Sequence, residues 1–377
     1  MAGTVLIAGG GTGGHVFPAL AVAGALRDAA PDLGVEFLGT SGGLEATLVP
    51  EAGYRLHTVD TLPLARRLSP STLRVPLVLR RASRQAASVI RDRQACAAVV
   101  FGGYVSVPLA LAARRTRLPL VVHEQNAVPG LANRLAGRWA AAVALTHPGT
   151  GFGRGRTEVT GNPVRPGLDP AAVSAGRDEA QEHFGLKPGH RTLLVFGGSQ
   201  GARRINTALL EAVTRWREPG RLQILHATGR RDHADVSAGW EQRLASVADA
   251  PLVRCVDFID RMDLAYAAAD AVLCRAGAST LAELTVLGLP AILVPYPHAT
   301  ADHQTANARG LAQAGAAVVV ADAELDADRL VAAVEAVLLD DARRETMARA
   351  ALAFARPDAA RHVAQIVLGL IDRKGEA

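Results

Sequence analysis

The chain has 377 residues, of which 49% are hydrophobic and 20% are charged, and its formal net charge is +5. This length exceeds what one hydrophobic core usually serves, so it favours two domains and excludes a small binding module. The composition is typical of a packed soluble protein, which excludes a disordered or low-complexity scaffold.

Short apolar runs alternate with helical patterns along the chain, which is typical of α/β units around a parallel sheet. The predicted strands are 4–8, 35–38, 97–101, 120–123, 142–145, 192–196, 222–227, 252–256, 271–274, 291–294 and 317–320. Residues 94–113 form an uncharged run of twenty, but Gly102, Gly103 and Pro108 interrupt it. We therefore interpret that run as a buried strand, a turn and a helix, and not as a membrane span.

Two of the predicted strands lead directly into glycine-rich turns. The first glycine turn, residues 9–14, has the sequence GGGTGG and precedes a helix expected to begin near Pro18. The second glycine turn, residues 197–201, has the sequence GGSQG and also precedes a helical pattern. This repetition about 190 residues apart predicts two similar α/β domains. The boundary is expected near residues 161–167, and an amphipathic helix around Val363 and Val367 closes the chain.

Glycine turns of this kind let the backbone approach an anionic ligand at a helix start. The first turn alone is also compatible with a nicotinamide-dependent dehydrogenase, because Glu36 lies about where such enzymes have an acidic residue that binds the ribose. A dehydrogenase needs only one such turn, whereas two facing turns suit a ligand held in a cleft between domains.

Polar residues follow several other predicted strands, where ligands of a parallel sheet usually bind. They are the stretches 123–126, 275–283 and 298–307, and a third glycine turn at 102–106 that could admit a second phosphorylated ligand. Two structural interpretations remain as alternatives. Residues 123–126 could be a loop whose polar groups are hydrogen-bonded within the protein, and Ser279 and Thr280 could cap the start of the next helix.

Metal and disulfide chemistry have little support in the sequence. Cys96, Cys255 and Cys274 are odd in number and widely spaced, which is consistent with a reducing cytosol. Asp326 and Asp328 form a D-x-D pair, but they precede a helical run where aspartates are ordinary. We therefore expect no metal site.

The excess positive charge is concentrated between Asp60 and Asp92, where no acidic residue occurs. Seven arginines lie there, and without them the net charge of +5 becomes −2. The segment also carries aliphatic residues and no aromatic, so we expect it to contact an anionic membrane surface and not nucleic acid. A solvated helix is the alternative. The predicted membrane patch comprises Arg66, Arg67, Leu73, Arg74, Leu77, Arg80, Arg81 and Arg84.

Eight motifs together make the chain resemble one family throughout its length. They are GGGTGGHVFPALAVA, GGYVSVP, HEQNAVPGLANR, GNPVR, GGSQGARRIN, FIDRM, RAGASTLAEL and HATADHQTANA, in the order and at about the spacing of the MurG family. That family transfers N-acetylglucosamine from UDP-N-acetylglucosamine (UDP-GlcNAc) to lipid I, giving lipid II in peptidoglycan synthesis. The resemblance implies an α/β GT-B fold, with two Rossmann-like domains and a ligand cleft between them.

The resemblance also implies a role for each domain and for single residues. Residues 1–161 would hold the acceptor and the membrane surface, with 356–377 packing back on them, and residues 162–355 would bind UDP-GlcNAc. Ile259 would contact uracil, Glu283 the ribose and Gln304 the sugar. The implied donor contacts are Thr12, Gly13, Gly14, Asn126, Arg165, Ser199, Ile259, Ala278, Ser279, Thr280, Leu281, Ala282, Glu283 and Gln304.

An inverting transfer to the C4 hydroxyl of the muramyl-pentapeptide needs a base for the hydroxyl proton. His15 is our candidate, because it follows the first glycine turn and an imidazole titrates near neutral pH. Its alternative role is to orient the turn or to hold the acceptor diphosphate, and Glu124 is the reserve base.

The remaining expectations concern partners and location. The resemblance implies no cofactor, and as partners UDP-GlcNAc, lipid I, an anionic membrane and other cell-wall synthesis proteins. It implies a peripheral protein at the cytoplasmic face of the plasma (inner) membrane, with a part in cell shape and division. Another lipid glycosyltransferase, a nucleotide-sugar epimerase, an NAD-dependent reductase and a non-catalytic nucleotide-binding protein are the alternatives.

Overall fold

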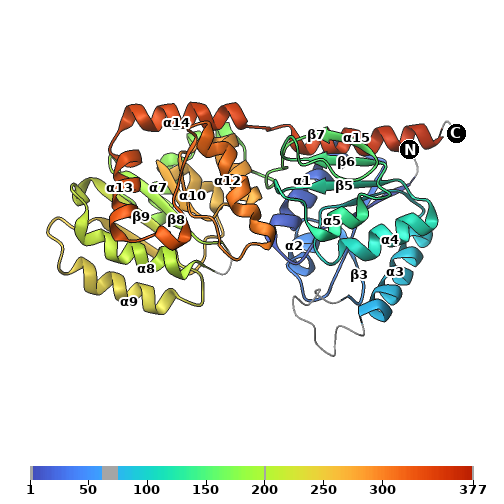
Figure 1. The fold of residues 1–377 in the computed structure, drawn as a ribbon, viewed down its shortest axis with the longest axis horizontal. Helices are drawn as coiled ribbons and strands as arrows, with labels where there is room; N and C mark the ends of the chain where they lie inside the picture. The colour runs from blue at the N-terminus through green and yellow to red at the C-terminus, as the bar shows by residue number, and fades with distance from the viewer. Residues whose placement is uncertain (1–2, 62–74, 199–200, 376–377) are drawn as a thin grey trace. The chain divides into compact units, whose positions relative to one another are not determined.

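The computed structural model describes residues 3–61, 75–198 and 201–375. The chain forms two compact units, each with its own sheet and core (Figure 1). The first unit comprises residues 1–166 and 356–377, and the second unit comprises residues 167–355.

The described residues of the first unit form a seven-stranded parallel sheet in the order β3-β2-β1-β4-β5-β6-β7. Its strands are β1 (Thr4–Ala8), β2 (Gly34–Gly39), β3 (Arg55–Thr58), β4 (Ala95–Val100), β5 (Leu120–Glu124), β6 (Ala142–Leu145) and β7 (Arg156–Val159). Its helices are α1 (Gly13–Ala29), α2 (Glu45–Glu51), α3 (Val75–Asp92), α4 (Ser106–Thr116), α5 (Leu131–Ala136) and α15 (Ala359–Gly375).

Both faces of the first sheet are covered by helices. Successive residues of a strand point to opposite faces, so Leu6 belongs to the core under α3 and α4, whereas Ile7 belongs to the core under α1. Val363 and Val367 bring α15 into that second core, where α15 packs against α1. Covering on both faces explains why the central strands are continuous apolar runs.

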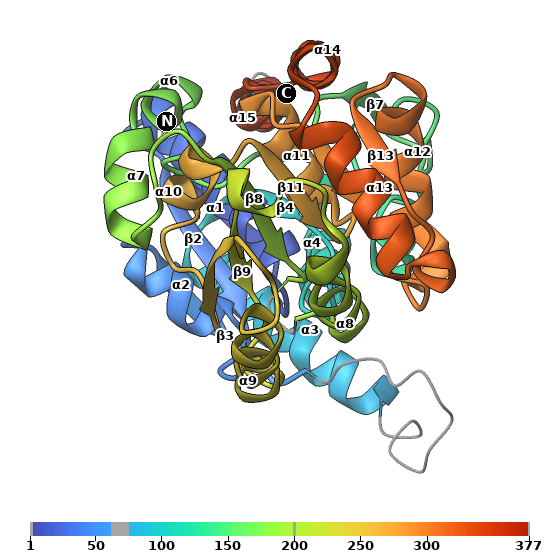
Figure 2. The same cartoon turned by 90° about the vertical axis from the view of Figure 1, so that its left-hand side faces the viewer.

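The described residues of the second unit form a six-stranded parallel sheet in the order β10-β9-β8-β11-β12-β13. Its strands are β8 (Arg191–Phe196), β9 (Leu222–Ala227), β10 (Leu252–Val256), β11 (Ala271–Cys274), β12 (Ala291–Leu293) and β13 (Ala317–Val319). Its helices are α6 (Pro170–Ala175), α7 (Arg177–Phe184), α8 (Arg203–Ala212), α9 (His233–Leu244), α10 (Met262–Ala268), α11 (Ala278–Leu287), α12 (His303–Gln313), α13 (Ala327–Leu338) and α14 (Asp341–Phe354). Figure 2 shows α8 and α13 on one side of β8 and β9, and α7 and α10 on the other.

The predicted α/β fold with parallel sheets is confirmed, and every predicted strand is present. The structure adds β3 and β7, which the sequence did not predict. Both are edge strands of the first sheet, with the sequences RLHT and RTEV. An edge strand is less buried than a central one, so neither segment needs the apolar run by which the others were identified.

The expected start of α1 near Pro18 is wrong, because the helix begins at Gly13. The carbonyl of Thr12 already accepts from the backbone N–H groups of His15 (3.0 Å) and Val16 (3.2 Å). Proline is common at the first position of a helix, but here it lies inside the helix. The end of the first glycine turn is therefore the first turn of α1, and it carries His15.

The uncharged run at 94–113 contains β4 and α4, as predicted. Of the helices in the described ranges, none combines the length and the apolarity that crossing a bilayer requires.

A buried histidine on β9 connects the strand to two neighbouring helices. Nδ1 of His226 accepts from Nε1 of Trp240 (3.1 Å), and tryptophan can only donate. The ring proton is therefore on Nε2, which donates to Oδ1 of Asn206 (3.0 Å). Burial lowers the pKa of His226 to about 3, and the nearby His233 adds to this effect.

This arrangement predicts a loss of stability in mild acid. The unfolded chain protonates histidine near pH 6.5, whereas folded His226 stays neutral to about pH 3, so stability decreases as the pH falls below 6.5. At pH 5 this one group costs about 2 kcal/mol. Urea unfolding followed by circular dichroism at pH 7.5 and pH 5 should show that His226→Gln loses about 2 kcal/mol less than the parent protein. The same pH dependence in both proteins would contradict this assignment.

Candidate functional site

In each unit a glycine turn lies where the strand order reverses. The chain continues from β1 to one side of the sheet, whereas β4 and its successors lie on the other side. The loops after β1 and β4 therefore diverge at the carboxyl edge, which is where open α/β sheets bind ligands. The second unit repeats this arrangement with the loops after β8 and β11.

The first and third glycine turns pack directly against each other. Gly102 and Gly103 have φ values of +95° and +77°, a conformation that favours glycine. A Cβ on Gly103 would lie 2.7 Å from the carbonyl oxygen of Gly10, and one on Gly102 would lie 3.2 Å from Nε2 of His15. The third turn therefore forms a wall beside the first turn.

His15, the candidate base, lies beside this wall in the first turn of α1. Its side chain is half-buried, and Nδ1 lies 3.1 Å from Oγ1 of Thr12. The glycines opposite leave room for the imidazole, and the hydroxyl of Thr12 fixes its orientation.

Glu45 is a functional candidate that the sequence reading missed. Its carboxylate is 1% exposed and accepts from the backbone N–H of Gly11 (2.9 Å), the backbone N–H of Thr40 (3.1 Å) and Oγ1 of Thr40 (2.8 Å). A Cβ on Gly10 would lie 2.6 Å from Cδ of Glu45, and one on Gly43 would lie 2.1 Å from Oε2. Glu45 therefore holds the first glycine turn from beneath. No local pattern marks this role, because glutamate is ordinary at the start of a helix such as α2.

Glu124, the reserve base, lies at the end of β5 and is also 1% exposed. Oε1 accepts from the backbone N–H (3.0 Å) and Nδ2 (3.2 Å) of Asn126, and Oε2 accepts from the backbone N–H of Gly130 (2.9 Å) and Nδ2 of Asn133 (2.9 Å). Four donors around one carboxylate organise the loop after β5. A general base must reach the substrate proton, so this arrangement favours His15.

The other predicted donor contacts of the first unit lie on separate loops. Thr12, Gly13 and Gly14 are at the start of α1, and Asn126 is held by Glu124. The guanidinium of Arg165 lies over the ring of Phe17, 4.6 Å from its centroid, so Arg165 is anchored on α1.

In the second unit the predicted diphosphate contacts surround the β8–β11 reversal. Gly201 has a φ of +72°, and a Cβ there would lie 2.3 Å from the carbonyl oxygen of Thr228, so the second glycine turn packs tightly on the end of β9. Ser199 lies outside the described residues.

Helix α11 begins beside this turn, with Gly277 as its N-cap. The alternative of Ser279 or Thr280 as the cap is therefore wrong, because both lie in the first helical turn. The amide of Leu281 donates to the carbonyl of Gly277 (3.0 Å). The amides that precede it, residues 278–280, point out of the helix start, as an anion site requires.

The remaining predicted donor contacts also follow carboxyl ends of strands or lie on α11 and α12. Ile259 is buried after β10, and Glu283 is buried and accepts from the hydroxyl of Tyr266 (2.7 Å). Oε1 of Gln304 accepts from the backbone N–H of Tyr296 (2.9 Å). Ala278, Leu281 and Ala282 lie on α11 with Glu283.

Glu36 is the residue that made a dehydrogenase possible, but its carboxylate is bound by other side chains of the first unit. Its carboxylate forms an ion pair with Arg93 and a hydrogen bond with Nε2 of His57 (2.6 Å). Burial alone would raise the pKa of Glu36, but the hydrogen bonds from Arg93 and His57 outweigh it and hold that pKa below its usual value. The feature that suggested a ribose acid is thus part of a buried charge network.

Within the described ranges, no three histidine, cysteine, aspartate or glutamate side chains are grouped to hold a metal ion. Asp326 is the N-cap of α13 and accepts from the backbone N–H of Arg329 (2.8 Å), the helix-start role predicted for it.

The packing of Glu45 predicts a coupled pair of substitutions. Gly10→Ala should destabilise the protein by about 1–3 kcal/mol through overpacking against the carboxylate, and Glu45→Ala by about 1–3 kcal/mol by leaving its donors unpaired. Since Glu45→Ala removes the clash, the double variant should be no less stable than Glu45→Ala alone, as measured by urea unfolding. Gly42→Ala is the control, because a Cβ there meets nothing within 4 Å. Additive losses would contradict the assignment.

Family models match both units of the chain. The N-terminal domain model of glycosyltransferase family 28 matches residues 5–145, and the C-terminal domain model of the same family matches residues 192–363. The two matches together cover most of the chain.

Relatives with a stated activity match almost the full length. The UDP-N-acetylglucosamine--N-acetylmuramyl-(pentapeptide) pyrophosphoryl-undecaprenol N-acetylglucosamine transferase of Nocardioides sp. is 45% identical over 366 residues, which covers 97% of this chain and 98% of the relative. The enzyme of that name from Streptomyces coelicolor is 44% identical, covering 94% of each chain.

Solved structures also match nearly the whole chain. The crystal structure of MurG from Acinetobacter baumannii has a TM-score of 0.75 at 31% identity and covers 97% of this chain and 99% of that one. A UDP-GlcNAc 2-epimerase from Neisseria meningitidis has a TM-score of 0.70, but at 12% identity it shows a shared fold alone. The predicted GT-B fold class is confirmed, and the chain belongs to the MurG family of glycosyltransferases.

Proposed function

We infer that the chain transfers N-acetylglucosamine from UDP-GlcNAc to the C4 hydroxyl of the muramyl-pentapeptide of lipid I, giving lipid II in peptidoglycan synthesis. The observation that carries this is the 45% identity, over nearly the whole of both chains, to a transferase of that name. The glycine turns of both units lie at strand reversals, where open α/β sheets usually bind ligands, and this supports the proposal.

The reaction sets three physical requirements. The acceptor hydroxyl attacks C1 of the sugar from the face opposite UDP, so the C1–O bond to the diphosphate breaks as the new glycosidic bond forms. A base must take the hydroxyl proton, and positive potential must stabilise the departing diphosphate.

We propose that His15 takes the proton. When Nδ1 donates to Oγ1 of Thr12, the lone pair is on Nε2, and Nε2 then accepts the proton of the acceptor hydroxyl. Glu45 fixes the turn that precedes His15, so it acts as a positioning residue beneath the site.

We place the donor in the second unit. The start of α11 and the described part of the second glycine turn would bind the diphosphate. The resemblance also assigns Ser199 and Arg165 to the donor. Helix starts and an arginine supply the positive potential, so no metal or other cofactor is required. Ile259 would contact uracil, Glu283 the ribose and Gln304 the sugar.

The base assignment predicts a specific kinetic effect. His15→Ala should lower kcat by about 10²–10⁴-fold while the KM for UDP-GlcNAc changes little. A radiolabelled-donor assay with a water-soluble acceptor analogue measures both constants. His183→Ala, which removes an exposed histidine of the second unit, is the matched control. If only the donor KM rose, His15 would be a ligand and not a base.

The same assay tests the function itself. Transfer of label to the acceptor supports the proposal, and no product at micromolar enzyme would overturn it. Label in an acceptor-free sugar product would instead indicate an epimerase.

We also propose that the protein binds the cytoplasmic face of the plasma membrane peripherally, through the outer face of α3. Leu77, Arg80, Arg81 and Arg84 are exposed at i, i+3, i+4 and i+7, which places them on one stripe of the helix. The opposite face of α3 is buried, including Ala86 and Ile90. The other residues of the predicted patch, Arg66, Arg67, Leu73 and Arg74, lie outside the described residues.

A charge reversal tests this stripe. Arg80→Glu, Arg81→Glu and Arg84→Glu together should abolish sedimentation with vesicles that contain phosphatidylglycerol, because each arginine near an anionic surface contributes about 1 kcal/mol. UDP binding should stay unchanged. The control is Arg329→Glu, Arg343→Glu and Arg349→Glu, which reverses three exposed charges of the second unit. Equal vesicle binding by stripe variant and parent would mean that α3 is a solvated helix.

A further inference from the structure

A buried tyrosine on α10 contacts one of the proposed donor residues and belongs to none of the eight motifs. Helix α10 begins at Met262, shortly after Ile259, the residue proposed to contact uracil. Tyr266 lies on the next turn of α10 and is 1% exposed. Its hydroxyl donates to Oε2 of Glu283 (2.7 Å), the residue of α11 proposed to contact the ribose. Helix α10 therefore connects the proposed uracil contact to the proposed ribose contact.

The hydroxyl of Tyr266 matters to Glu283 because this carboxylate is almost completely buried. Only 1% of Glu283 is exposed, so water can supply little of the hydrogen bonding that an ionised carboxylate requires. Burial raises the pKa of the Cys274 thiol, and the charge of Glu283 raises it further, so the thiol stays neutral near the carboxylate. Hydrogen bonds to an ionised group are stronger than those between neutral groups. The orientation of the Glu283 carboxylate therefore depends on Tyr266.

The ring of Tyr266 is held in place separately from its hydroxyl. It packs against the ring of Phe196 at the end of β8, with the two centroids 6.4 Å apart and the two planes at 67°. Edge-to-face pairs of this kind are a favoured arrangement of aromatic rings. The second glycine turn begins at the next residue, Gly197. Tyr266→Phe keeps this ring packing while it removes the hydroxyl.

A ribose suits a carboxylate whose orientation is fixed. Its two hydroxyl groups lie on adjacent carbons, and each can donate to a carboxylate oxygen. An ionised carboxylate has about four acceptor positions, and the hydroxyl of Tyr266 takes one of them. Hydrogen bonds weaken steeply when their angle departs from linear, so both ribose hydroxyls can donate well only if the carboxylate plane is turned toward them. A donor that fixes this plane therefore favours ribose over 2′-deoxyribose.

We propose that Tyr266 is a positioning residue that holds the Glu283 carboxylate for the ribose hydroxyls, and that this pair makes the nucleotide site selective for ribonucleotides. The inference rests on the donor site of the proposed function and deepens it. Tyr266 does not contact the nucleotide itself, because it acts through Glu283.

Binding of UDP and of 2′-deoxy-UDP, measured by isothermal titration, tests the pair without an acceptor and without catalysis. The parent protein should bind UDP about tenfold more tightly than 2′-deoxy-UDP, because the 2′-hydroxyl donates to an ionised carboxylate. Tyr266→Phe should lower this preference to about twofold, mainly by weakening UDP binding. A purely structural role of Tyr266 would weaken both nucleotides equally and leave the preference unchanged.

A double variant tests whether Tyr266 acts through the carboxylate. Tyr266→Phe in the background of Glu283→Gln leaves no buried carboxylate without its tyrosine donor, so this variant also avoids the main threat to folding. It should bind UDP within about twofold of Glu283→Gln alone, because the group that Tyr266 positions is already changed. A further loss of about tenfold would mean that Tyr266 acts by another route, and would overturn the proposal.

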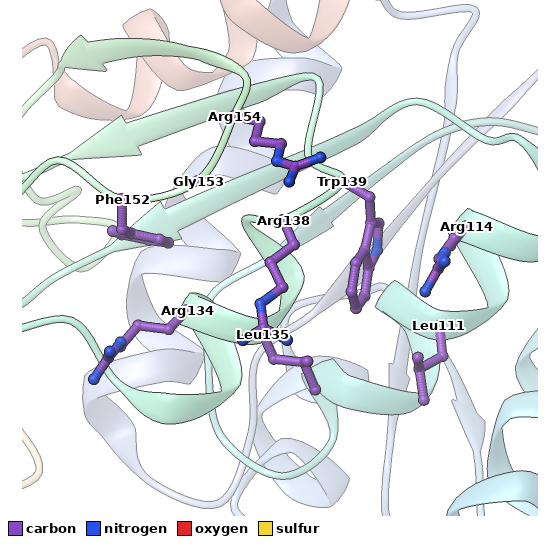
Figure 3. A pocket seen from close by; sticks show the side chains of 9 residues that line it. All are labelled: Leu111, Arg114, Arg134, Leu135, Arg138, Trp139, Phe152, Gly153 and Arg154. Carbon is purple, nitrogen blue, oxygen red and sulfur yellow. The ribbon is translucent and has the colours of Figure 1, made fainter.

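Two control variants separate this effect from a general loss of stability. Tyr54→Phe removes a tyrosine hydroxyl of the first unit, where Tyr54 packs against Phe37. Trp139→Phe removes a side-chain hydrogen bond, because Nε1 of Trp139 donates to the carbonyl of Ala110 (3.0 Å). Trp139 lines a hollow of the first unit together with four arginines (Figure 3). Both controls should keep the UDP affinity and the nucleotide preference of the parent protein.

Two results of the titrations would overturn the proposal. The first is an unchanged preference in Tyr266→Phe, whether or not UDP binding becomes weaker. The second is a parent protein that binds UDP and 2′-deoxy-UDP equally, because Glu283 would then not accept from the 2′-hydroxyl.

The transferase assay keeps this proposal separate from the proposed function. Tyr266→Phe should raise the KM for UDP-GlcNAc about tenfold at an unchanged kcat, because the ribose contact is made before and during the reaction. A lower kcat at an unchanged KM would overturn the proposal. If the parent protein transfers no sugar but prefers UDP through Tyr266, the proposed function fails and this inference stands. If it transfers sugar and Tyr266→Phe keeps the preference, this inference alone fails.

Discussion

The site of the first unit depends on the close approach of two backbone turns at the strand reversal. A Cβ on Gly103 would clash with the carbonyl of Gly10, and a Cβ on Gly102 would press against the imidazole of His15. Parallel strands that part at a reversal leave a crevice at their carboxyl ends, and here both walls are bare backbone. Glu45 then holds the first glycine turn in place, because its carboxylate accepts from the backbone N–H of Gly11. The position of His15 follows from these contacts and from the start of α1.

The sequence predicted the central strands because both faces of each sheet are covered. Strands such as β1 and β8 must be continuous apolar runs, and such runs are visible without a structure. The edge strands β3 and β7 carry no such run. The site divides in a similar way: the glycine turns have a local signal, whereas the role of Glu45 depends on Gly11, 34 residues away.

We propose that the two units use one topology for different purposes. In the first unit the proposed base, His15, lies beside the crevice, and Glu45 holds the glycine turn from beneath. In the second unit the corresponding place is the start of α11, where backbone amides point outward and Gly277, which carries no side chain, is the cap. Amides suit a diphosphate and an imidazole suits a hydroxyl proton. This difference fits the proposed division, with the acceptor on the first unit and the sugar nucleotide on the second.

Part of the positive charge of the chain lies on the outer face of α3. On α3 the arginines are exposed on a single helical stripe, so their attraction to an anionic surface is long-range and sensitive to salt. An acceptor whose lipid tail stays in the bilayer must be met at the membrane surface. We propose that the stripe on α3 brings the first unit to that surface.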